Sequence, residues 1–422
     1  MKKVGLALLG LGTIGCGVMK VLQENGEMIK NREGLDIEVK RILVRDKSKK
    51  RQFQVDASLL TDNLQEILDD NSIEVIAEFM GGEMPAFTFI RDALRRGKSV
   101  ITANKEVIAK RWDELEMEAQ KSGAGLYFEA SVAGGIPIIK SVRRSLQANN
   151  VQMLMGIING TTNFILTRMS EEGRSFEDIL AEAQRLGYAE PDPTADVEGH
   201  DARYKLSILS TICFRNRVTV DNIYCEGITK ISADDIGYAK DLGFGIKLLA
   251  IAKKQNGKIE ARVHPTFIPL SHPLSAVRDA YNAIYIKGDM VGNLMFYGRG
   301  AGDLPTASAL VSDIITACQN SGAHHRVKLD DEQVTFEEDW KDEYYLRLVV
   351  RDQPGVLAEI AGIFGRHNVS LDSVMQKLRG NDHATIIFIT HEAHEKWIHA
   401  ALEEMRNCPS VISIESLIRV ER

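Results

Sequence analysis

Along the first 130 residues, short apolar runs alternate with segments whose apolar residues recur at helical spacing. Short apolar runs bounded by small or polar residues are typical of buried strands. Four such runs occur here: VGLALL, IEVKRILV, VIAEFMG and SVITA. Between them, apolar residues recur at helical spacing from about Ile14 onwards and again over about 85–96. Strands that alternate with helices predict an α/β domain with a parallel, doubly wound sheet, which we place at residues 1–130.

The pattern changes after residue 130. Gly- and Thr-rich turns separate alternating strands such as NAIYIKGD and NLMFYGRG, and helices are expected at about 175–187 and 201–213. This mixture predicts an α+β domain on a mostly open sheet over residues 131–303. The run TASALVSDIITACQN predicts a long helix. We expect residues 304–325 to pack on the first domain.

Two further segments complete the chain. Residues 326–342 are polar and strongly acidic without clear periodicity, which indicates a linker. Residues 343–422 follow the order strand, helix, strand, strand, helix, strand. That order is the βαββαβ pattern of a ferredoxin-like domain.

Length and composition agree with several globular domains. A chain of 422 residues exceeds one average domain, and its hydrophobic fraction of 44% and charged fraction of 26% are ordinary for globular proteins. The formal charge of −7 disfavours a nucleic-acid partner, and no apolar run is long enough to cross a bilayer. Glycines interrupt the apolar region that an N-terminal signal peptide would need. We therefore expect a cytoplasmic protein without a membrane partner.

The five cysteines are scattered along the chain, odd in number and without C-x-x-C spacing. This usage indicates neither a disulfide framework nor a zinc site. We expect the cysteines to be small, buried apolar residues.

A glycine motif follows the first strand. Residues 10–15, Gly-Leu-Gly-Thr-Ile-Gly, fit the pattern G-x-G-x-x-G between a strand and a helix. In that context the first glycine permits a tight turn, the second lets the backbone approach a pyrophosphate, and the third lets the helix pack on the strand. The positive end of the helix would face the phosphates. The motif therefore predicts dinucleotide binding, and a glycine turn without a ligand is the alternative.

Cations occur at the ends of the second and fourth strands. An acid at the end of the second strand selects NAD, whereas a cation accommodates the 2′-phosphate of NADP. Here Arg45 begins the run RDKSKK, which favours NADP, while Asp46 leaves NAD open. Lys105 ends the run ITANK, at the carboxyl end of the fourth strand, where open α/β sheets bind ligands. Lys105 is therefore a candidate for contact with substrate or nicotinamide, and a surface lysine is the alternative.

The segment GYAEPDPTADVEGHDARYK, residues 187–205, gathers acids ahead of a lysine. Prolines on either side of Asp192 exclude a helix there and present Glu190 as a fixed acceptor for an ammonium group. Hydride transfer between an alcohol and a carbonyl also requires a proton donor or acceptor, a role that Lys205 fits. The alternative is a solvated helical turn in which Asp201 pairs with Lys205.

Together these motifs resemble those of homoserine dehydrogenase over the whole chain. The resemblance rests on GLGTIGCGV, TANK, EASVAGGIP, NGTTN, GYAEPDPTADVEGHDARYKL and GRGAGDLPTASA. It implies a Rossmann-type N-terminal domain and a middle domain that binds substrate and forms a dimer. It also implies NAD- or NADP-dependent interconversion of L-homoserine and L-aspartate 4-semialdehyde, a step towards threonine and methionine.

The same resemblance implies roles for individual residues. Lys205 matches the family's proton-transferring lysine, and Lys105 matches a second essential lysine near cofactor and substrate. The implied substrate-binding positions are Glu190, Asp196, Asp201, Gly160 and Thr161, and the implied cofactor positions are Gly10, Gly12, Thr13, Ile14, Gly15, Arg45, Lys105 and Gly302. A monovalent cation, usually sodium, is implied at Glu129 and at the backbone carbonyls of Val132, Gly134 and Ile136, where a tight Gly-Pro turn is the alternative.

The last domain resembles an ACT module through the run RLVVRDQPGVLAEIAGIFGRHNVSL. Such modules pair and bind a small amino acid, which implies threonine as the effector and Asp352, Gly355 and Asn368 as positions near it. The alternative is a module that only assists assembly into a homodimer or homotetramer. For the whole chain, the alternatives are a dehydrogenase of another amino-acid semialdehyde and a non-catalytic dinucleotide sensor.

Overall fold

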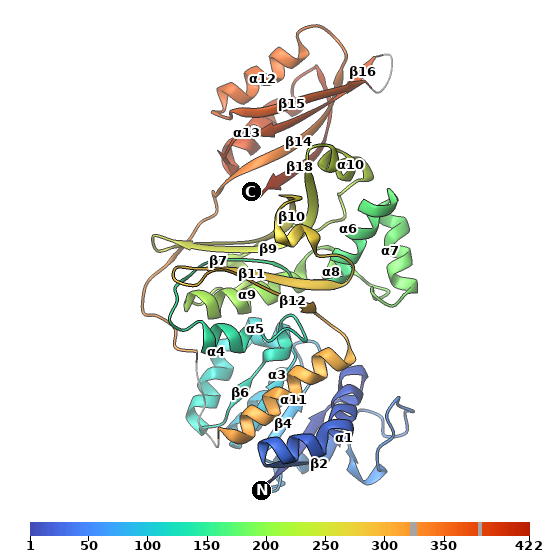
Figure 1. Cartoon of the computed structure of the whole chain (residues 1–422), viewed down its shortest axis with the longest axis vertical. Coiled ribbons are helices and arrows are strands. Elements are labelled where there is room, and N and C mark those ends of the chain that lie inside the picture. Colours follow the sequence, from blue (N-terminus) through green and yellow to red (C-terminus); the bar gives the residue numbers. More distant parts are fainter. Residues whose placement is uncertain (321–326, 379–381) are drawn as a thin grey trace. The chain divides into compact units, whose positions relative to one another are not determined.

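The computed structural model describes residues 1–320, 327–378 and 382–422 (Figure 1). The chain divides into two compact units, each built from three separate stretches of sequence. The first unit comprises Met1–Leu154, Asp201–Ile223 and Tyr281–Gln333. The second unit comprises Met155–His200, Tyr224–Ala280 and Val334–Arg422.

A six-stranded sheet forms the centre of the first unit, and its neighbouring strands are all parallel. The strand order β3-β2-β1-β4-β5-β6 is that of doubly wound dinucleotide-binding folds. Residues 4–9 are buried throughout, because β1 is a central strand covered on both faces. The predicted parallel sheet is thus confirmed. Its strands are β1 (Lys2–Leu9), β2 (Leu35–Leu43), β3 (Leu60–Thr61), β4 (Val75–Glu78), β5 (Ser99–Thr102) and β6 (Leu126–Tyr127).

Helices and a hairpin complete the first unit. The helix predicted after the glycine turn is α1, and the helix predicted over about 85–96 is α3. The helix predicted at 201–213 is α9. The predicted strands NAIYIKGD and NLMFYGRG form the antiparallel hairpin β11-β12. The bounds are α1 (Thr13–Glu33), η1 (Ala57–Leu59), α2 (Leu64–Leu68), α3 (Ala86–Arg95), α4 (Lys105–Ser122), η2 (Glu129–Ser131), α5 (Ile138–Lys140), η3 (Ser141–Ser145), α9 (His200–Phe214), η4 (Val220–Asn222), β11 (Tyr281–Gly288), β12 (Gly292–Arg299) and α11 (Asp303–Gln319).

Helix α11, the long helix predicted from TASALVSDIITACQN, packs directly on α1. Gly17 permits the close approach, because a Cβ at this position would lie 2.8 Å from the carbonyl oxygen of Asp303. Ala307 and Leu310 of α11 then enter the same apolar core as Val18. The helix that is last in sequence in this unit therefore buries its apolar face beside the first.

The second unit contains a long antiparallel hairpin, β9 (Phe244–Gln255) and β10 (Lys258–Pro269). Asn256 and Gly257 form its two-residue turn, and both have positive φ, as the twist of a tight hairpin requires. The helix predicted at about 175–187 is α7. The other elements before the C-terminal module are β7 (Val151–Ile157, whose first residues belong to the first unit), α6 (Gly160–Glu172), α7 (Phe176–Arg185), α8 (Thr194–Val197), β8 (Tyr224–Cys225), α10 (Ala233–Asp241), η5 (Pro273–Ala276) and β13 (Thr335–Phe336).

The C-terminal module has the predicted βαββαβ order, with a sheet in the order β18-β14-β16-β15. Its elements are β14 (Lys341–Arg351), α12 (Val356–Arg366), β15 (Leu371–Leu378), β16 (His383–Thr390), β17 (Ala393–His394), α13 (Glu395–Arg406) and β18 (Val411–Val420). The last strand also pairs in parallel with β10, through Thr266 with Arg419 and Phe267 with Val420. Within the second unit, the sheet of the module therefore continues into the hairpin, a connection that the sequence did not predict.

The acidic segment before the module also contributes to this sheet, because β13 pairs in parallel with the start of β10. All five cysteines have free thiols; Cys225 is half-buried and the other four are buried. Among the helices of the described residues, none combines the length and apolar character needed to span a membrane.

Candidate active site

Lys205, Asp201 and Lys105 come together in the first unit. Asp201 and Lys205 lie one turn apart on α9, and Lys205 Nζ donates a 2.6 Å hydrogen bond to Asp201 Oδ2. Lys105 begins α4, and its Nζ lies 3.0 Å from Asp201 Oδ1. The exposed side-chain fraction is only 7% for Asp201 and 12% for Lys205, but 43% for Lys105. One buried carboxylate thus bridges two ammonium groups, which a solvated helical turn would not provide.

Buried polar groups hold the start of α4. Asn104 caps the helix with its side-chain oxygen, and its backbone N–H donates to Thr102 Oγ1 at 2.9 Å. Thr102 Oγ1 in turn donates to Glu78 Oε2 at 2.6 Å. Burial raises the pKa of Glu78, which is fully enclosed at the end of β4. These bonds position Lys105 at the strand ends. The asparagine cap has a sequence signal, whereas Glu78 has none and was missed.

A cavity of about 790 Å³ opens at the glycine turn, and Gly10, Gly12, Thr13 and Arg45 line it. Gly10 has φ +111°, a conformation that favours glycine. A Cβ on Gly12 would find none of the described atoms within 4 Å, whereas a Cβ on Gly15 would lie 2.7 Å from the carbonyl oxygen of Gly10. The turn therefore leaves room for a pyrophosphate above Gly12 while α1 packs closely behind it, and the residues fit a dinucleotide.

The loop after β2 makes one end of this cavity basic. Arg45, Lys49, Lys50 and Arg51 line the cavity together with Asp46. The Asp46 carboxylate accepts hydrogen bonds from the side chain and backbone of the neighbouring serine, at 2.6 and 2.8 Å, and these bonds lower its pKa. The Asp46 carboxylate is thus engaged within the loop itself, and Asp62, which also lines the cavity, pairs with Lys47 at 2.9 Å. The four cations therefore leave a surplus of positive charge.

The remaining predicted cofactor positions also lie in the first unit. Ile14 is the second residue of α1, and Gly302 immediately precedes α11 with φ +119°. In the part of the chain that the structure describes, neither residue is among those that line the cavity, and the same holds for Lys105.

The predicted substrate-binding residues of the second unit surround the start of α6. Asn159 caps this helix, and its Nδ2 donates to Asp196 Oδ1 at 2.7 Å. Thr161 Oγ1 donates to the carbonyl oxygen of Tyr188 at 2.8 Å, on the same loop as Glu190. The Glu190 side chain is exposed. The structure thus joins the NGTTN motif to the Pro-rich loop by direct hydrogen bonds.

Gly160 marks a close approach in the same region, because a Cβ there would lie 2.9 Å from the carbonyl oxygen of Ala280. This contact explains a glycine at the first position of α6. The asparagine that precedes it, Asn159, was not singled out from sequence although asparagine is among the residues preferred at helix N-termini.

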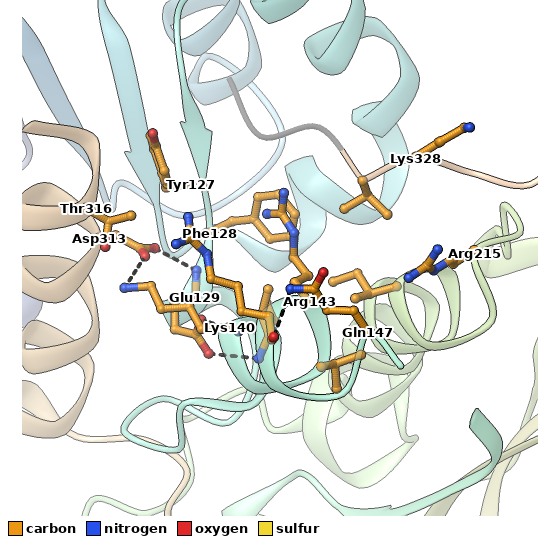
Figure 2. Close-up of a pocket in the computed structure, with 15 residues that line it drawn as sticks. Tyr127, Phe128, Glu129, Lys140, Arg143, Gln147, Arg215, Asp313, Thr316 and Lys328 are labelled. Carbon is orange, nitrogen blue, oxygen red and sulfur yellow. Dashed lines mark hydrogen bonds and ion pairs between the residues drawn. The ribbon is translucent and has the colours of Figure 1, made fainter. Parts of the chain in front are cut away.

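The loop predicted to hold a cation lies in the first unit (Figure 2). Glu129 Oε1 and Oε2 accept backbone hydrogen bonds from Ile139 and Lys140, each at 2.8 Å. Burial, reinforced by the nearby Asp313, raises the pKa of Glu129 to about 7. The Glu129 carboxylate thus binds the backbone at the start of α5. Each of its oxygens keeps a second lone pair, so the cation site expected at Glu129 and at the backbone carbonyls of Val132, Gly134 and Ile136 stays a prediction.

Over residues 1–320, 327–378 and 382–422, no group of three His, Cys, Asp or Glu side chains is placed to hold a metal ion. A cation held by carbonyl oxygens would leave no such group.

The predicted effector positions divide between the two ends of one helix. Asp352 follows β14 and Gly355, with φ +94°, caps the N-terminus of α12. Asn368, with φ +58°, follows the C-terminus of α12. All three residues are exposed. A single chain therefore brings Asp352 and Gly355 together but not Asn368.

Family comparisons cover most of the chain. Residues 137–315 match the model of the homoserine dehydrogenase family, residues 10–129 that of the homoserine dehydrogenase NAD binding domain, and residues 344–410 that of the ACT domain. The homoserine dehydrogenase of Corynebacterium glutamicum is 44% identical over 428 residues, covering 99% of this chain and 96% of the relative. That of Bacillus subtilis is 39% identical over 428 residues, covering 100% and 99%.

Solved structures of homoserine dehydrogenases are similar to this chain in fold and sequence. The crystal structure of a homoserine dehydrogenase from Thiobacillus denitrificans has a TM-score of 0.92 and 41% identity, and the match covers 100% of this chain and 99% of the other. A hyperthermophilic archaeal homoserine dehydrogenase in complex with NADPH has a TM-score of 0.64 and 28% identity, covering 76% and 98%. The expected α/β fold with a nucleotide-binding domain and a C-terminal ACT domain is confirmed.

Proposed function

Because the chain belongs to the homoserine dehydrogenase family and is an oxidoreductase acting on the CH–OH group of homoserine, we propose that Lys205 exchanges a proton with the substrate oxygen. The bridge from Lys205 through the buried Asp201 to Lys105 is the observation that supports this role. A buried carboxylate stabilises an ammonium group beside it, which suits a lysine that must hold and release a proton.

When bound, the nicotinamide dinucleotide supplies a hydride acceptor for the alcohol carbon. As the C–H bond breaks, neutral Lys205 takes the hydroxyl proton and becomes an ammonium group, leaving the aldehyde of L-aspartate 4-semialdehyde. In the reverse direction the Lys205 ammonium returns that proton to the forming alkoxide. Asp201 holds Lys205 in position and offsets its charge, and Lys105 adds a second cation near the developing charge on oxygen.

Substrate binding is assigned to the second unit's loop. Glu190 would accept the ammonium group of homoserine, and Asp196, Gly160 and Thr161 are the further substrate-binding positions. The hydrogen bond from Asn159 to Asp196 supports this assignment, because it gives the loop a defined place on α6.

Lys205→Ala tests the proton-transfer role. General acid–base groups contribute about 10²–10⁴-fold, so kcat should fall by that factor while the Kd for NADPH stays unchanged. Lys20→Ala, at an exposed lysine of α1, is the control for the loss of one lysine. A folded Lys205→Ala protein with ordinary turnover would remove Lys205 from this role.

NADP is the proposed cofactor of choice, supported by the basic lining at Arg45. Arg45→Ala should raise KM for NADPH by about 10-fold and leave KM for NADH nearly unchanged, because only NADPH loses a charge-assisted contact. An equal rise in KM for both cofactors would contradict the proposal that Arg45 binds the 2′-phosphate.

Sodium is proposed at the backbone carbonyls of Val132, Gly134 and Ile136. Positive φ values of 56° at Ala133 and 47° at Gly134 turn the backbone sharply in this loop, which supports carbonyl rather than side-chain coordination. Activity measured in sodium chloride should exceed that in choline chloride at equal ionic strength. Equal activity in the two salts would contradict the proposal.

Threonine is proposed as an effector that binds the C-terminal ACT module near Asp352 and Gly355, and through it inhibits a step that leads to threonine. The position of Asp352 and Gly355 at the N-terminus of α12 supports a ligand there, since the positive end of a helix favours a carboxylate. Isothermal titration with threonine should show binding that Gly355→Leu abolishes.

We further propose that the protein is a homodimer or homotetramer. Light scattering would measure its mass in solution directly.

A further inference from the structure

A second cavity of the first unit has a volume of about 450 Å³ (Figure 2). It is lined by the end of β6 and the residues after it, by α5 and η3, by the end of α9, by α11 and by residues 327–328. Small-molecule sites have volumes of roughly 300–1,000 Å³, so this cavity is large enough to hold a metabolite. The residues that line it are separate from those that line the dinucleotide cavity and from Lys105, Asp201 and Lys205. It is therefore a different place from the proposed catalytic site.

Positive charge dominates the lining of this cavity. Two acids line it, Glu129 and Asp313, against five cations: Lys140, Arg143, Arg144, Arg215 and Lys328. Cavities lined by one sign of charge concentrate ions of the opposite sign. The lining therefore favours an anionic occupant.

Both acids are already engaged by the wall. Asp313 Oδ1 lies 2.9 Å from Lys140 Nζ, and Asp313 Oδ2 accepts the backbone N–H of Glu129 at 2.8 Å. Both carboxylate oxygens of Glu129 accept backbone N–H groups of α5. These contacts offset Lys140 and give every carboxylate oxygen of the two acids a partner in the wall.

The other cations lack such compensation. Over the residues that the structure describes, the side chains of Arg144, Arg215 and Lys328 form no ion pair, and all three residues are exposed. Arg143 is more enclosed, and burial lowers the pKa of its guanidinium. In Figure 2, Arg215 and Lys328 lie on the side of the cavity away from Glu129 and Asp313. The cavity thus has a neutralised wall and a basic wall.

Apolar side chains form the rest of the lining. Phe128, Ile139, Val142, Ile212 and Val327 are all buried and contribute to it. A site of this kind binds a molecule that carries an apolar body and a charged group, since the body displaces water from the apolar surface while the charge meets the cations.

We propose that this cavity binds a small organic phosphate, a phosphomonoester on an apolar body, with Arg144, Arg215 and Lys328 at the phosphate. A phosphomonoester carries close to two negative charges at neutral pH, and guanidinium groups match its oxygens in a fork geometry. A carboxylate carries one charge and would leave more of the positive surplus unbalanced. The proposal is independent of the function proposed above.

Phenyl phosphate is the probe, because it has an aromatic body, one phosphomonoester and no adenine. Isothermal titration of the full-length protein, saturated with NADPH, should show one binding event. Benzoate at the same ionic strength should bind at least about 10-fold more weakly. The double variant Arg144→Gln, Arg215→Asn should weaken phenyl phosphate binding by about 10-fold or more. Asparagine is chosen at Arg215 because that residue has φ +53°, which asparagine tolerates.

Arg32→Gln, at an exposed arginine of the last turn of α1, is the matched control and should bind as the parent does. Circular dichroism and homoserine-dependent turnover report whether each variant is folded, and the single variants replace the double variant if it is not. Three outcomes would overturn the proposal: benzoate binding as tightly as phenyl phosphate, full binding by the folded pocket variants, or binding only when NADPH is omitted.

Discussion

The Asp201 side chain is almost fully enclosed, and each of its two carboxylate oxygens faces an ammonium group. Removing one charge from such a buried cluster leaves the others uncompensated. We expect Asp201 to act through Lys205 and Lys105, which it holds in place, while its contact with substrate stays a prediction. Asp201 is a positioning residue in this sense.

Asp201→Asn should lower kcat by about 10–100-fold, because the amide keeps the shape but leaves two ammonium groups adjacent without a countercharge. Steady-state assays and NADPH titration give the measurement, with the Kd for NADPH unchanged. Asp201→Glu should recover part of the lost turnover, since it restores the charge at a slightly different place. If Asn and Glu variants lost kcat equally while both stayed folded, charge would not be the reason.

Lys247 shows how burial at one residue couples stability to pH. It lies on β9, is 6% exposed, and donates to Asn163 Oδ1 at 3.0 Å and to the carbonyl oxygen of Val277. Burial lowers the pKa of Lys247 from 10.5 to about 8. The unfolded chain therefore holds a proton on this lysine between pH 8 and 10.5 that the folded chain has released.

Because the unfolded state binds more protons in that window, the contribution of Lys247 to stability should rise with pH, by up to about 3 kcal/mol between pH 8 and 10.5. Urea unfolding at a series of pH values should show that the free energy of unfolding of the parent rises with pH relative to that of Lys247→Met. Lys230→Met, at an exposed lysine of the same unit, is the control for lost charge. A pH-independent difference between the parent and Lys247→Met would contradict the pKa shift.

At the scale of elements, the joint between β10 and the C-terminal module depends on buried ion pairs. Arg262 of β10 is fully buried and contacts Asp342 of β14 and, at 3.2 Å, Glu421 just beyond β18. Arg419 of β18 contacts Glu395, the first residue of α13. Charge pairs therefore accompany the short parallel register between β10 and β18.

Arg262→Leu should destabilise the protein by about 3–5 kcal/mol, because it leaves the buried carboxylate of Asp342 without its cation. Lys258→Ala removes an exposed pair with Glu337 from the same strand and should cost less than about 1 kcal/mol. Denaturant unfolding of the two variants measures both effects. Equal losses would show that burial of the pair is irrelevant to its contribution.

Two compact units make up the whole molecule, and the proposed ligands divide between them. The glycine turn that would hold the cofactor belongs to the first unit, and the ACT module that would bind threonine belongs to the second. A ligand stabilises the folded state that binds it, and local stability is measurable as amide exchange.

Hydrogen exchange followed by mass spectrometry should therefore show separate footprints. NADPH at 100 times its Kd should slow exchange at residues 4–18, by up to about 100-fold at the most protected amides. Threonine should slow exchange in residues 343–366. Protection by NADPH that is absent from residues 4–18 would contradict the cofactor site. Serine at the same concentration is the control for threonine.

Much of this architecture was accessible from sequence for a local reason. Strand and helix periods, the glycine motif and the βαββαβ order are carried by neighbouring residues, so they predicted the parallel sheet, α7, α9, α11 and the C-terminal module. The i,i+4 spacing of Asp201 and Lys205 is equally local, and the pair was expected on one helical face.

Contacts between distant residues were decided only by the tertiary structure. Nothing in the sequence near Lys105 indicates that α9 brings Asp201 to its ammonium group, that Glu129 turns its carboxylate to α5, or that β18 extends a sheet through β10. The cations of the basic cavity are also brought together by packing, since they come from three separate stretches of chain. Sequence determined the periods and motifs because these act over a few residues; packing determined the site because burial and charge pairing join residues that are far apart along the chain.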